Sequence, residues 1–89
     1  MIERDIEIKN KLGLHARAAA KLVHTSARFH SDVKIRKGEE EVDGKSILGI
    51  LLLAAGRGSS IHVRVEGDDE RDALEAIEKL VDGKFDEVE

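Results

Sequence analysis

Hydrophobic and charged residues alternate in two stretches of the chain, one at its start and one after its middle. Between Ile2 and Lys9, isoleucine occupies positions 2, 6 and 8, and every odd position is charged. Ile61, Val63 and Val65 repeat this period of two, with polar or charged residues between them. Such alternation is typical of strands that bury one face and expose the other.

A third alternating stretch, residues 32–41, contains the pair Lys37-Gly38. A pair of this kind favours a tight turn, so the stretch is predicted to form a hairpin with these two residues at its tip. That register places Val33 opposite Val42 on the buried side.

Two longer stretches place apolar residues at helical spacing. The first, residues 16–28, is rich in alanine, which has the highest helix propensity. The second starts after an N-cap supplied by Asp68 or Asp69 and ends at Gly83. The polar tail that follows, residues 84–89, is expected to fray. The predicted core faces are Ala19, Leu22, Val23 and Ala27 in the first helix, and Ala73, Leu74, Ile77, Leu80 and Val81 in the second.

A short third helix is predicted over the apolar run from Ile47 to Leu53, with Ser46 as its N-cap. The run is apolar on nearly all sides, and a domain this small cannot bury all of it. Part of the run is therefore expected to form a hydrophobic patch on the surface.

The order of elements is strand, helix, strand, strand, helix, strand, helix. It predicts an α+β fold, an open-faced β-sandwich in which three helices cover one face of a four-stranded, mainly antiparallel sheet. The 89 residues suit a single domain, residues 1–89. The alternating strands agree with a second sheet face that meets water.

Composition narrows the classes of function. A net charge of −4 and only two aromatic residues, Phe29 and Phe85, argue against nucleic-acid binding. No cysteine and no spacing of metal ligands is present, so we expect no metal site and no cofactor. No apolar run is long enough to insert into a membrane, and the first residues lack the pattern of a signal peptide, which predicts a cytoplasmic protein.

The segment with the clearest chemical potential is Asn10 to Lys21, where a turn at Gly13 places His15 at the start of a helix. A helix start offers unpaired backbone amides, here those of Ala16 and Arg17, and the positive end of the helix dipole. This setting disfavours a protonated imidazole and suits an anion, so a phosphate carried by His15 is one interpretation. A purely structural histidine is the other.

A basic stripe extends away from His15 along the same helix. Its members recur at i, i+4, i+7 and i+11, which places them on one face. A solvated helix face is the ordinary explanation, whereas a docking surface for an acidic partner is the functional one. The stripe consists of Arg17, Lys21, His24 and Arg28. By contrast, His30 and His62 show no such pattern and are expected to be simply exposed.

Two separated motifs resemble the HPr family of phosphocarriers of the phosphoenolpyruvate-dependent phosphotransferase system. The first is Gly13-Leu14-His15-Ala16-Arg17-Ala18-Ala19, and the second is Lys45-Ser46-Ile47-Leu48-Gly49. The family usually has proline where this chain has Ala18, a side chain that the chemistry does not use. The likeness extends over the whole chain in the order and spacing of its elements.

The resemblance implies that His15 accepts phosphate on Nδ1 from enzyme I and passes it to a IIA-type protein or domain. Arg17 would assist the transfer. The protein would be a covalent relay without small-molecule turnover of its own, and it is expected to be monomeric. Ser46 would be a regulatory site for an HPr serine kinase/phosphorylase. The partner surface would add Lys45, Ile47, Leu48 and Leu51 to the basic stripe.

Two questions stay open at the level of sequence. The alternative function is a non-catalytic regulatory module that acts through Ser46 phosphorylation and partner docking. Within the family, Asn10-Lys11-Leu12-Gly13 and the 83–87 segment resemble the nitrogen-related branch, whereas Lys45-Ser46-Ile47 resembles the sugar-system branch.

Overall fold

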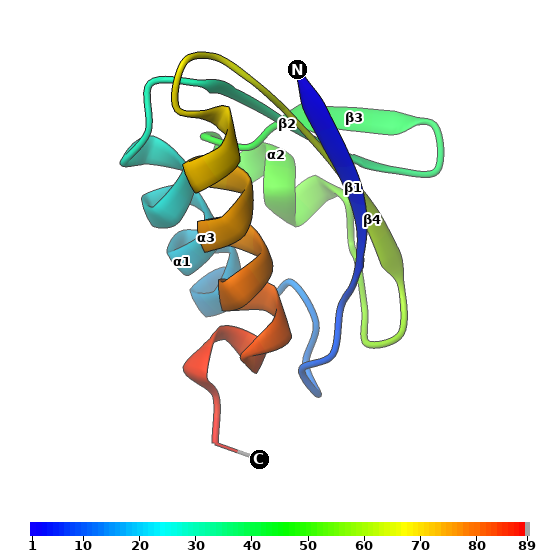
Figure 1. Ribbon diagram of the computed structural model, residues 1–89. Helices are drawn as coiled ribbons and strands as arrows, with labels where there is room; N and C mark the ends of the chain where they lie inside the picture. The colour runs from blue at the N-terminus through cyan, green and yellow to red at the C-terminus, as the bar shows by residue number, and fades with distance from the viewer. Residues whose placement is uncertain (89) are drawn as a thin grey trace.

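The computed structural model describes residues 1–88 (Figure 1). Along the chain, the elements are β1 (Ile2–Glu7), α1 (Ala16–Ala27), β2 (Asp32–Lys37), β3 (Glu40–Asp43), α2 (Ile47–Leu52), β4 (Ser60–Glu66), α3 (Glu70–Asp82) and the short 3₁₀ turn η1 (Lys84–Asp86). This order is the one predicted from the hydrophobic pattern, with η1 added at the end.

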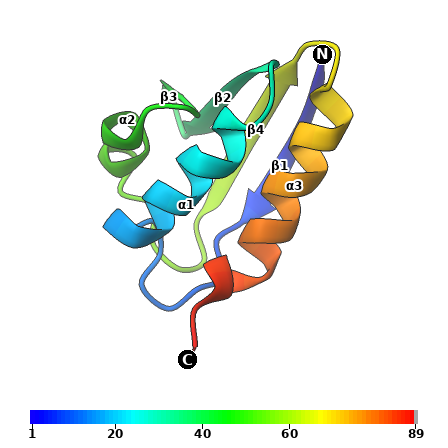
Figure 2. The same ribbon diagram turned by 90° about the vertical axis from the view of Figure 1, so that its left-hand side faces the viewer.

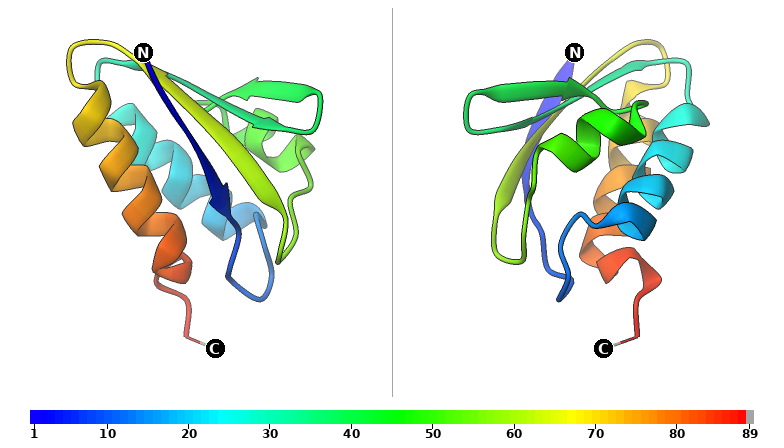
Figure 3. Two further views of the ribbon diagram at one scale, coloured as in Figure 1. Left: turned by 45° about the vertical axis from the view of Figure 1, so that its right-hand side comes forward. Right: turned by 180° about the vertical axis from the view of Figure 1, so that it is seen from behind.

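The four strands form one sheet in the order β1-β4-β2-β3, and every neighbouring pair is antiparallel. The two outer strands, β1 and β3, are both rich in acidic residues. The helices lie on one face of this sheet, as Figures 2 and 3 show. The predicted α+β open-faced sandwich is therefore confirmed.

A single aliphatic core fills the space between the sheet and the helices. Its strand members alternate along β2 and β4, because every second side chain points toward the helices. Each of the largest members is almost wholly removed from water: Ile8, Leu22, Ile35, Ile50, Ile61, Ile77 and Phe85. Within the described residues, none of the helices is long and apolar enough to cross a membrane.

The β2–β3 hairpin forms, but its register differs from the prediction. Lys37 pairs with Glu40, so the two-residue turn is Gly38-Glu39, and Ile35 rather than Val33 lies opposite Val42. Gly38 has φ of +62°, a left-handed conformation that glycine adopts without steric cost. The shift of the turn by one residue moves the pairing by two positions, which keeps the same faces buried.

Helix α1 buries a slightly different face from the one predicted. Ala19 and Leu22 are buried as expected, but Ala27 is exposed, and Ala18 and Ser26 are buried instead. Small side chains at these positions let the helix approach its neighbours closely. In α3 the expected stripe is confirmed, and Gly83 ends the helix.

The C-terminal tail packs against the domain as far as Glu87, contrary to the expected fraying; Glu89 lies outside the described residues. Lys84, Phe85 and Asp86 all adopt left-handed backbone conformations, with φ of 57°, 56° and 60°. The Phe85 side chain is completely buried. Burial of this ring offsets the steric cost of three left-handed residues that are not glycine.

The open face of the sheet contains another histidine with partners that the sequence did not reveal. The His62 ring lies between Asp5 and Glu3, 2.8 and 2.7 Å from their carboxylates. These hydrogen bonds raise the pKa of His62, and the bond to Glu3 has the larger effect. The expectation of a simply exposed His62 is therefore wrong.

Candidate functional site

The turn that precedes α1 is fixed against the chain at residues 55–56. Gly13 has φ of +67°, and a Cβ atom there would lie 2.5 Å from the carbonyl oxygen of Ala55. The next amide, that of Leu14, donates to the same oxygen at 2.8 Å. Buried Asn10 donates from Nδ2 to the Gly13 carbonyl at 2.7 Å. A glycine is therefore needed at position 13, and this close packing sets the place of His15.

His15 occupies the N-cap position of α1, as predicted, with an extended backbone (φ −77°, ψ 179°). Its carbonyl accepts the first helical hydrogen bond, from Ala19 at 2.8 Å. No side chain among residues 1–88 caps this helix start. The amides of Ala16 and Arg17, which have no intrahelical acceptor, are left to bind an anion.

The His15 ring contacts a carboxylate that reaches it from the far end of the chain. Nε2 of His15 lies 2.5 Å from Oε2 of Glu87, and both side chains are largely buried, with exposed fractions of 29% and 14%. This hydrogen bond lowers the pKa of the Glu87 carboxyl. Sequence analysis missed Glu87, because a single glutamate in a polar tail has no periodic or motif signal.

Two further contacts attach the tail to this site. Nδ2 of Asn10 donates to Oε1 of Glu87 at 3.1 Å, and Nζ of Lys21 donates to the Phe85 carbonyl at 2.7 Å. In Figure 2, the C-terminal turn meets the loop that precedes α1. Lys21 therefore anchors the tail rather than extending freely from the basic stripe.

The other members of the basic stripe are exposed: Arg17, His24 and Arg28. Arg17 borders an open depression beside His15, whose lining also includes Leu12 and Glu87. The guanidinium of Arg28 stacks over the ring of Phe29, 5.4 Å from its centroid. The described part of the chain thus presents three of the four stripe residues to solvent, from Arg17 beside His15 to Arg28 at the far end of α1.

Helix α2 is preceded by its N-cap Ser46, whose Oγ accepts a hydrogen bond from the Gly49 amide at 3.1 Å. The predicted N-cap is confirmed. Lys45, predicted as a partner contact, donates from Nζ to the Phe29 carbonyl at 2.9 Å. This bond ties the start of α2 to the end of α1.

The hydrophobic patch expected on α2 is present. Ile47 and Leu48 have exposed fractions of 43% and 66%, whereas Leu51 is half-buried and packs against the core. Leu52, which sequence analysis did not single out, is 63% exposed. Because α2 packs beside α1, this apolar patch and the basic stripe belong to neighbouring helices (Figure 2).

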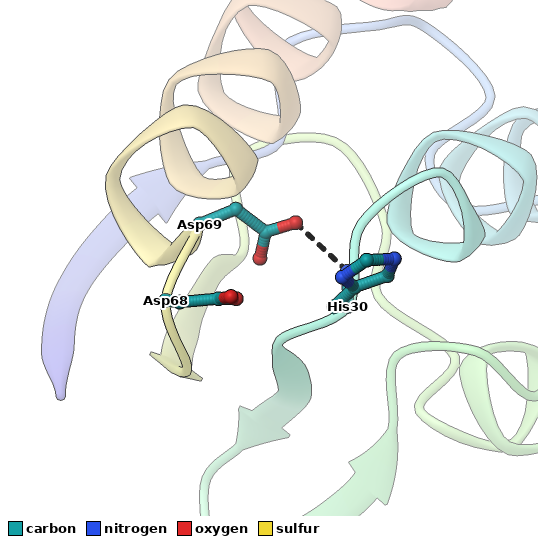
Figure 4. A group of neighbouring side chains, drawn as sticks. All are labelled: His30, Asp68 and Asp69. Carbon is teal, nitrogen blue, oxygen red and sulfur yellow. Dashed lines mark hydrogen bonds between the residues drawn. The ribbon is translucent and has the colours of Figure 1, made fainter.

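A second group of histidine and carboxylates lies at the opposite end of α1, where His30, Asp68 and Asp69 approach one another (Figure 4). The Asp69 carboxylate accepts hydrogen bonds from the backbone amides of His30 and Ser31, at 2.8 and 2.9 Å, and from the Ser31 hydroxyl. These hydrogen bonds lower the pKa of Asp69 to about 2, and the bond from the Ser31 hydroxyl has the largest effect. The Asp69 side chain thus holds the α1–β2 loop, although Asp69 occupies the N-cap position of α3, where this side chain makes no cap hydrogen bond.

Comparison with known proteins assigns the chain to a family. The family profile described as PTS HPr component phosphorylation site matches residues 2–83. The chain belongs to the HPr family. The profile covers His15 and Ser46 and stops before Glu87, so the contact between His15 and the tail lies partly outside the matched region.

Individual HPr relatives match over nearly the whole chain. The phosphocarrier protein HPr of Xylella fastidiosa (strain Temecula1) is 46% identical over 87 residues, which cover 98% of each chain. The phosphocarrier protein NPr of Shewanella violacea is also 46% identical over 87 residues, covering 98% of this chain and 96% of that protein. The crystal structure of HPr-C-His from Thermoanaerobacter tengcongensis is 44% identical, covers 100% of both chains and superposes with a TM-score of 0.96.

Proposed function

We propose that this protein is a phosphoryl carrier of the phosphotransferase system, with residues 1–89 acting as one domain. His15 accepts a phosphoryl group from phospho-enzyme I and passes it to a IIA-type protein or domain. The observation that carries this proposal is the imidazole at an uncapped helix start, with open backbone amides next to it. A module that acted only through docking would not need a nucleophile there.

The local chemistry supports a relay that holds phosphate without trapping it. The amides of Ala16 and Arg17 and the exposed Arg17 guanidinium give the phosphoryl oxygens a few charge-assisted hydrogen bonds. More cations would hold the group more tightly than onward transfer allows. The proposed carrier therefore performs covalent transfer without small-molecule turnover of its own.

Partner proteins are proposed to dock over α1 and α2. Exposed Arg17 and Arg28 offer positive charge, exposed His24 lies between them on the same helix, and exposed Ile47 and Leu48 offer apolar area. Enzyme I and the IIA acceptor would each present an acidic rim around an apolar centre to this surface. Lys21, Lys45 and Leu51 would then contribute indirectly. Their hydrogen bonds and packing would fix the positions of α1 and α2.

Regulation is proposed at Ser46, through an HPr serine kinase/phosphorylase. A phosphate at the start of α2 would be tolerated by the fold, because the helix dipole favours negative charge there. The same charge would repel an acidic partner that docks on the adjacent stripe. We place this carrier in the cytoplasm as a monomer.

Incubation with phosphoenolpyruvate and a matching enzyme I tests the central proposal. Intact-protein mass spectrometry should show one added phosphoryl group that is lost on acid treatment, and His15→Gln should show none. His30→Gln, which removes an exposed histidine beyond the opposite end of α1, serves as the matched control and should be modified normally. Absence of any added phosphate on the wild-type chain would refute the carrier role.

The branch of the family is tested with acceptors. Phosphorylated protein is offered in parallel to a sugar-specific IIA domain and to a nitrogen-related IIA protein, and the initial transfer rates are compared. The acceptor with the faster transfer identifies the system served. The chain is 46% identical both to an HPr and to an NPr, so sequence identity does not distinguish the two branches and the transfer rates are needed.

A further inference from the structure

The two nitrogens of the His15 ring have different environments. Nε2 is 2.5 Å from the Glu87 carboxylate, whereas Nδ1 makes no hydrogen bond to any of residues 1–88. A neutral imidazole carries one N–H, and a carboxylate can only accept a hydrogen bond. The proton of the neutral ring is therefore held on Nε2, and the lone pair is left on Nδ1.

Glu87 is held firmly enough to impose this preference. Its other carboxylate oxygen accepts from Nδ2 of Asn10, a residue with no exposed surface that also donates to the Gly13 carbonyl. One buried amide thus orients both the carboxylate and the turn that presents His15. Two hydrogen bonds thus connect the side chains of Asn10, Glu87 and His15 in sequence.

The backbone that delivers Glu87 is held as well. Three successive left-handed residues reverse the chain after α3, and the buried ring of Phe85 fixes the middle of this turn. Lys21, in the second turn of α1, donates to the Phe85 carbonyl. Ordered residues at such backbone angles require surrounding contacts that determine them, and these two contacts do so.

We propose that Glu87 is a positioning residue that keeps the neutral His15 ring in its Nε2–H form, so that Nδ1 is the nucleophile. The inference rests on the proposed carrier function and deepens it. In the transfer step, the Nδ1 lone pair forms the N–P bond while the bond from phosphorus to the donor atom breaks, and its electron pair leaves with the donor. The Nε2 proton stays in place throughout, hydrogen-bonded to Glu87.

Glu87→Gln gives the sharpest test, because Asn10 fixes the orientation of the new amide. The amide oxygen is expected to face Nδ2 of Asn10, and the amide NH₂ is expected to face Nε2 of His15. Nε2 must then accept, which moves the ring proton to Nδ1 and occupies the nucleophile. Glu87→Ala removes the preference without reversing it, and Asp86→Asn removes the same charge one residue away.

Two measurements are made on these variants. Single-turnover phosphorylation by phospho-enzyme I should be slowed about tenfold or more in Glu87→Gln, less in Glu87→Ala, and little in Asp86→Asn. The ¹⁵N chemical shifts of the His15 ring, measured where it is neutral, should identify Nδ1 as the unprotonated nitrogen in the wild type and Nε2 in Glu87→Gln. A role in packing alone would make alanine the more damaging substitution and would not exchange the two nitrogens.

The outcomes separate this inference from the carrier function. Normal phosphorylation of the wild type together with equal rates for Glu87→Gln and Asp86→Asn would overturn the role of Glu87 and leave the carrier intact. An Nδ1–H ring in the wild type would do the same. Failure of the wild type to accept any phosphate would refute the carrier function itself.

Discussion

The starts of α1 and α2 lie on neighbouring helices and use their N-cap residues in opposite ways. At α2, the Ser46 hydroxyl accepts from the Gly49 amide, and the helix satisfies its own donor. At α1, His15 has the N-cap position but makes no such bond, and its ring turns to Glu87 instead. One start is closed by its own residue, and the other is left open.

The difference shows how an open start is kept stable. Giving up a side-chain cap costs about 1 kcal/mol, which a helix must recover elsewhere. Helix α1 recovers it by burying Ala18, Ala19 and Leu22 in the core. The six-residue α2 has only Ile50 fully buried, so it depends more on its cap.

The largest effect is expected from closing the open start with His15→Ser. Phosphorylation by enzyme I should be abolished, because the nucleophile is gone. Compared with His15→Ala, the serine should raise the free energy of unfolding by about 1 kcal/mol, since it can cap α1. Mass spectrometry and urea unfolding measure the two effects; equal stability of the serine and alanine variants would show that this start cannot be capped.

The next largest effect is expected from Phe85→Ala, which removes the anchor of the tail at the open start. Loss of a fully buried phenylalanine should lower the free energy of unfolding by about 3–5 kcal/mol. Urea unfolding tests this, with exposed Val88→Ala as the control that should change little. A loss below 1 kcal/mol would mean that the tail does not contribute to the folded core.

Arg17→Ala is expected to slow transfer without affecting the fold. A charge-assisted hydrogen bond contributes about 1.5–3 kcal/mol, which corresponds to roughly a 10- to 100-fold slower single-turnover phosphorylation. Arg71→Ala removes the same charge from an exposed position on α3, and this variant should be phosphorylated as fast as the wild type. Equal rates for the two variants would remove Arg17 from the mechanism.

At the closed start, Ser46→Ala should lower the free energy of unfolding by about 1 kcal/mol. The rate of phosphorylation at His15 should stay unchanged, because the cap belongs to a different helix. Ser60→Ala, at an exposed strand position, is the control for loss of a hydroxyl. A Ser46→Ala variant that keeps full stability would show that the closed start does not need its cap.

The smallest effect concerns α3, where Asp69 is at the helix start but bonds to another loop. Its folded pKa of about 2 lies below the usual 3.8, so its hydrogen bonds stabilise the folded state above pH 4. This contribution is lost as the pH falls from about 4 to 2. The stability difference between wild type and Asp69→Asn, measured by urea unfolding, should therefore shrink over that range; a constant difference would contradict the assignment.

The sequence predicted those parts of the molecule that local patterns determine. Alternation located β1 and β4, and helical spacing located α3, because burial of one face is decided within a few residues. The position of His15 at the start of α1 and the Ser46 cap were predicted from the same local rules. The hairpin register was missed, since a shift by two residues leaves the buried face unchanged.

Contacts between distant segments could not be predicted in this way. Glu87 reaches His15 only because three residues that rarely adopt left-handed conformations do so in succession. The spacing of Lys21 places it in the basic stripe, yet its ammonium donates a hydrogen bond to the Phe85 carbonyl in the tail. Such interactions depend on how α1 and α3 pack, which no single stretch of sequence encodes.

The acidic outer strands have a consequence for how copies of this protein meet one another. A sheet edge offers unpaired amides and carbonyls that a second sheet can extend. Here β1 contributes Glu3, Asp5 and Glu7 and β3 contributes Glu40, Glu41 and Asp43, so two edges that approach would bring like charges together. This repulsion disfavours self-association through pairing of the two sheet edges.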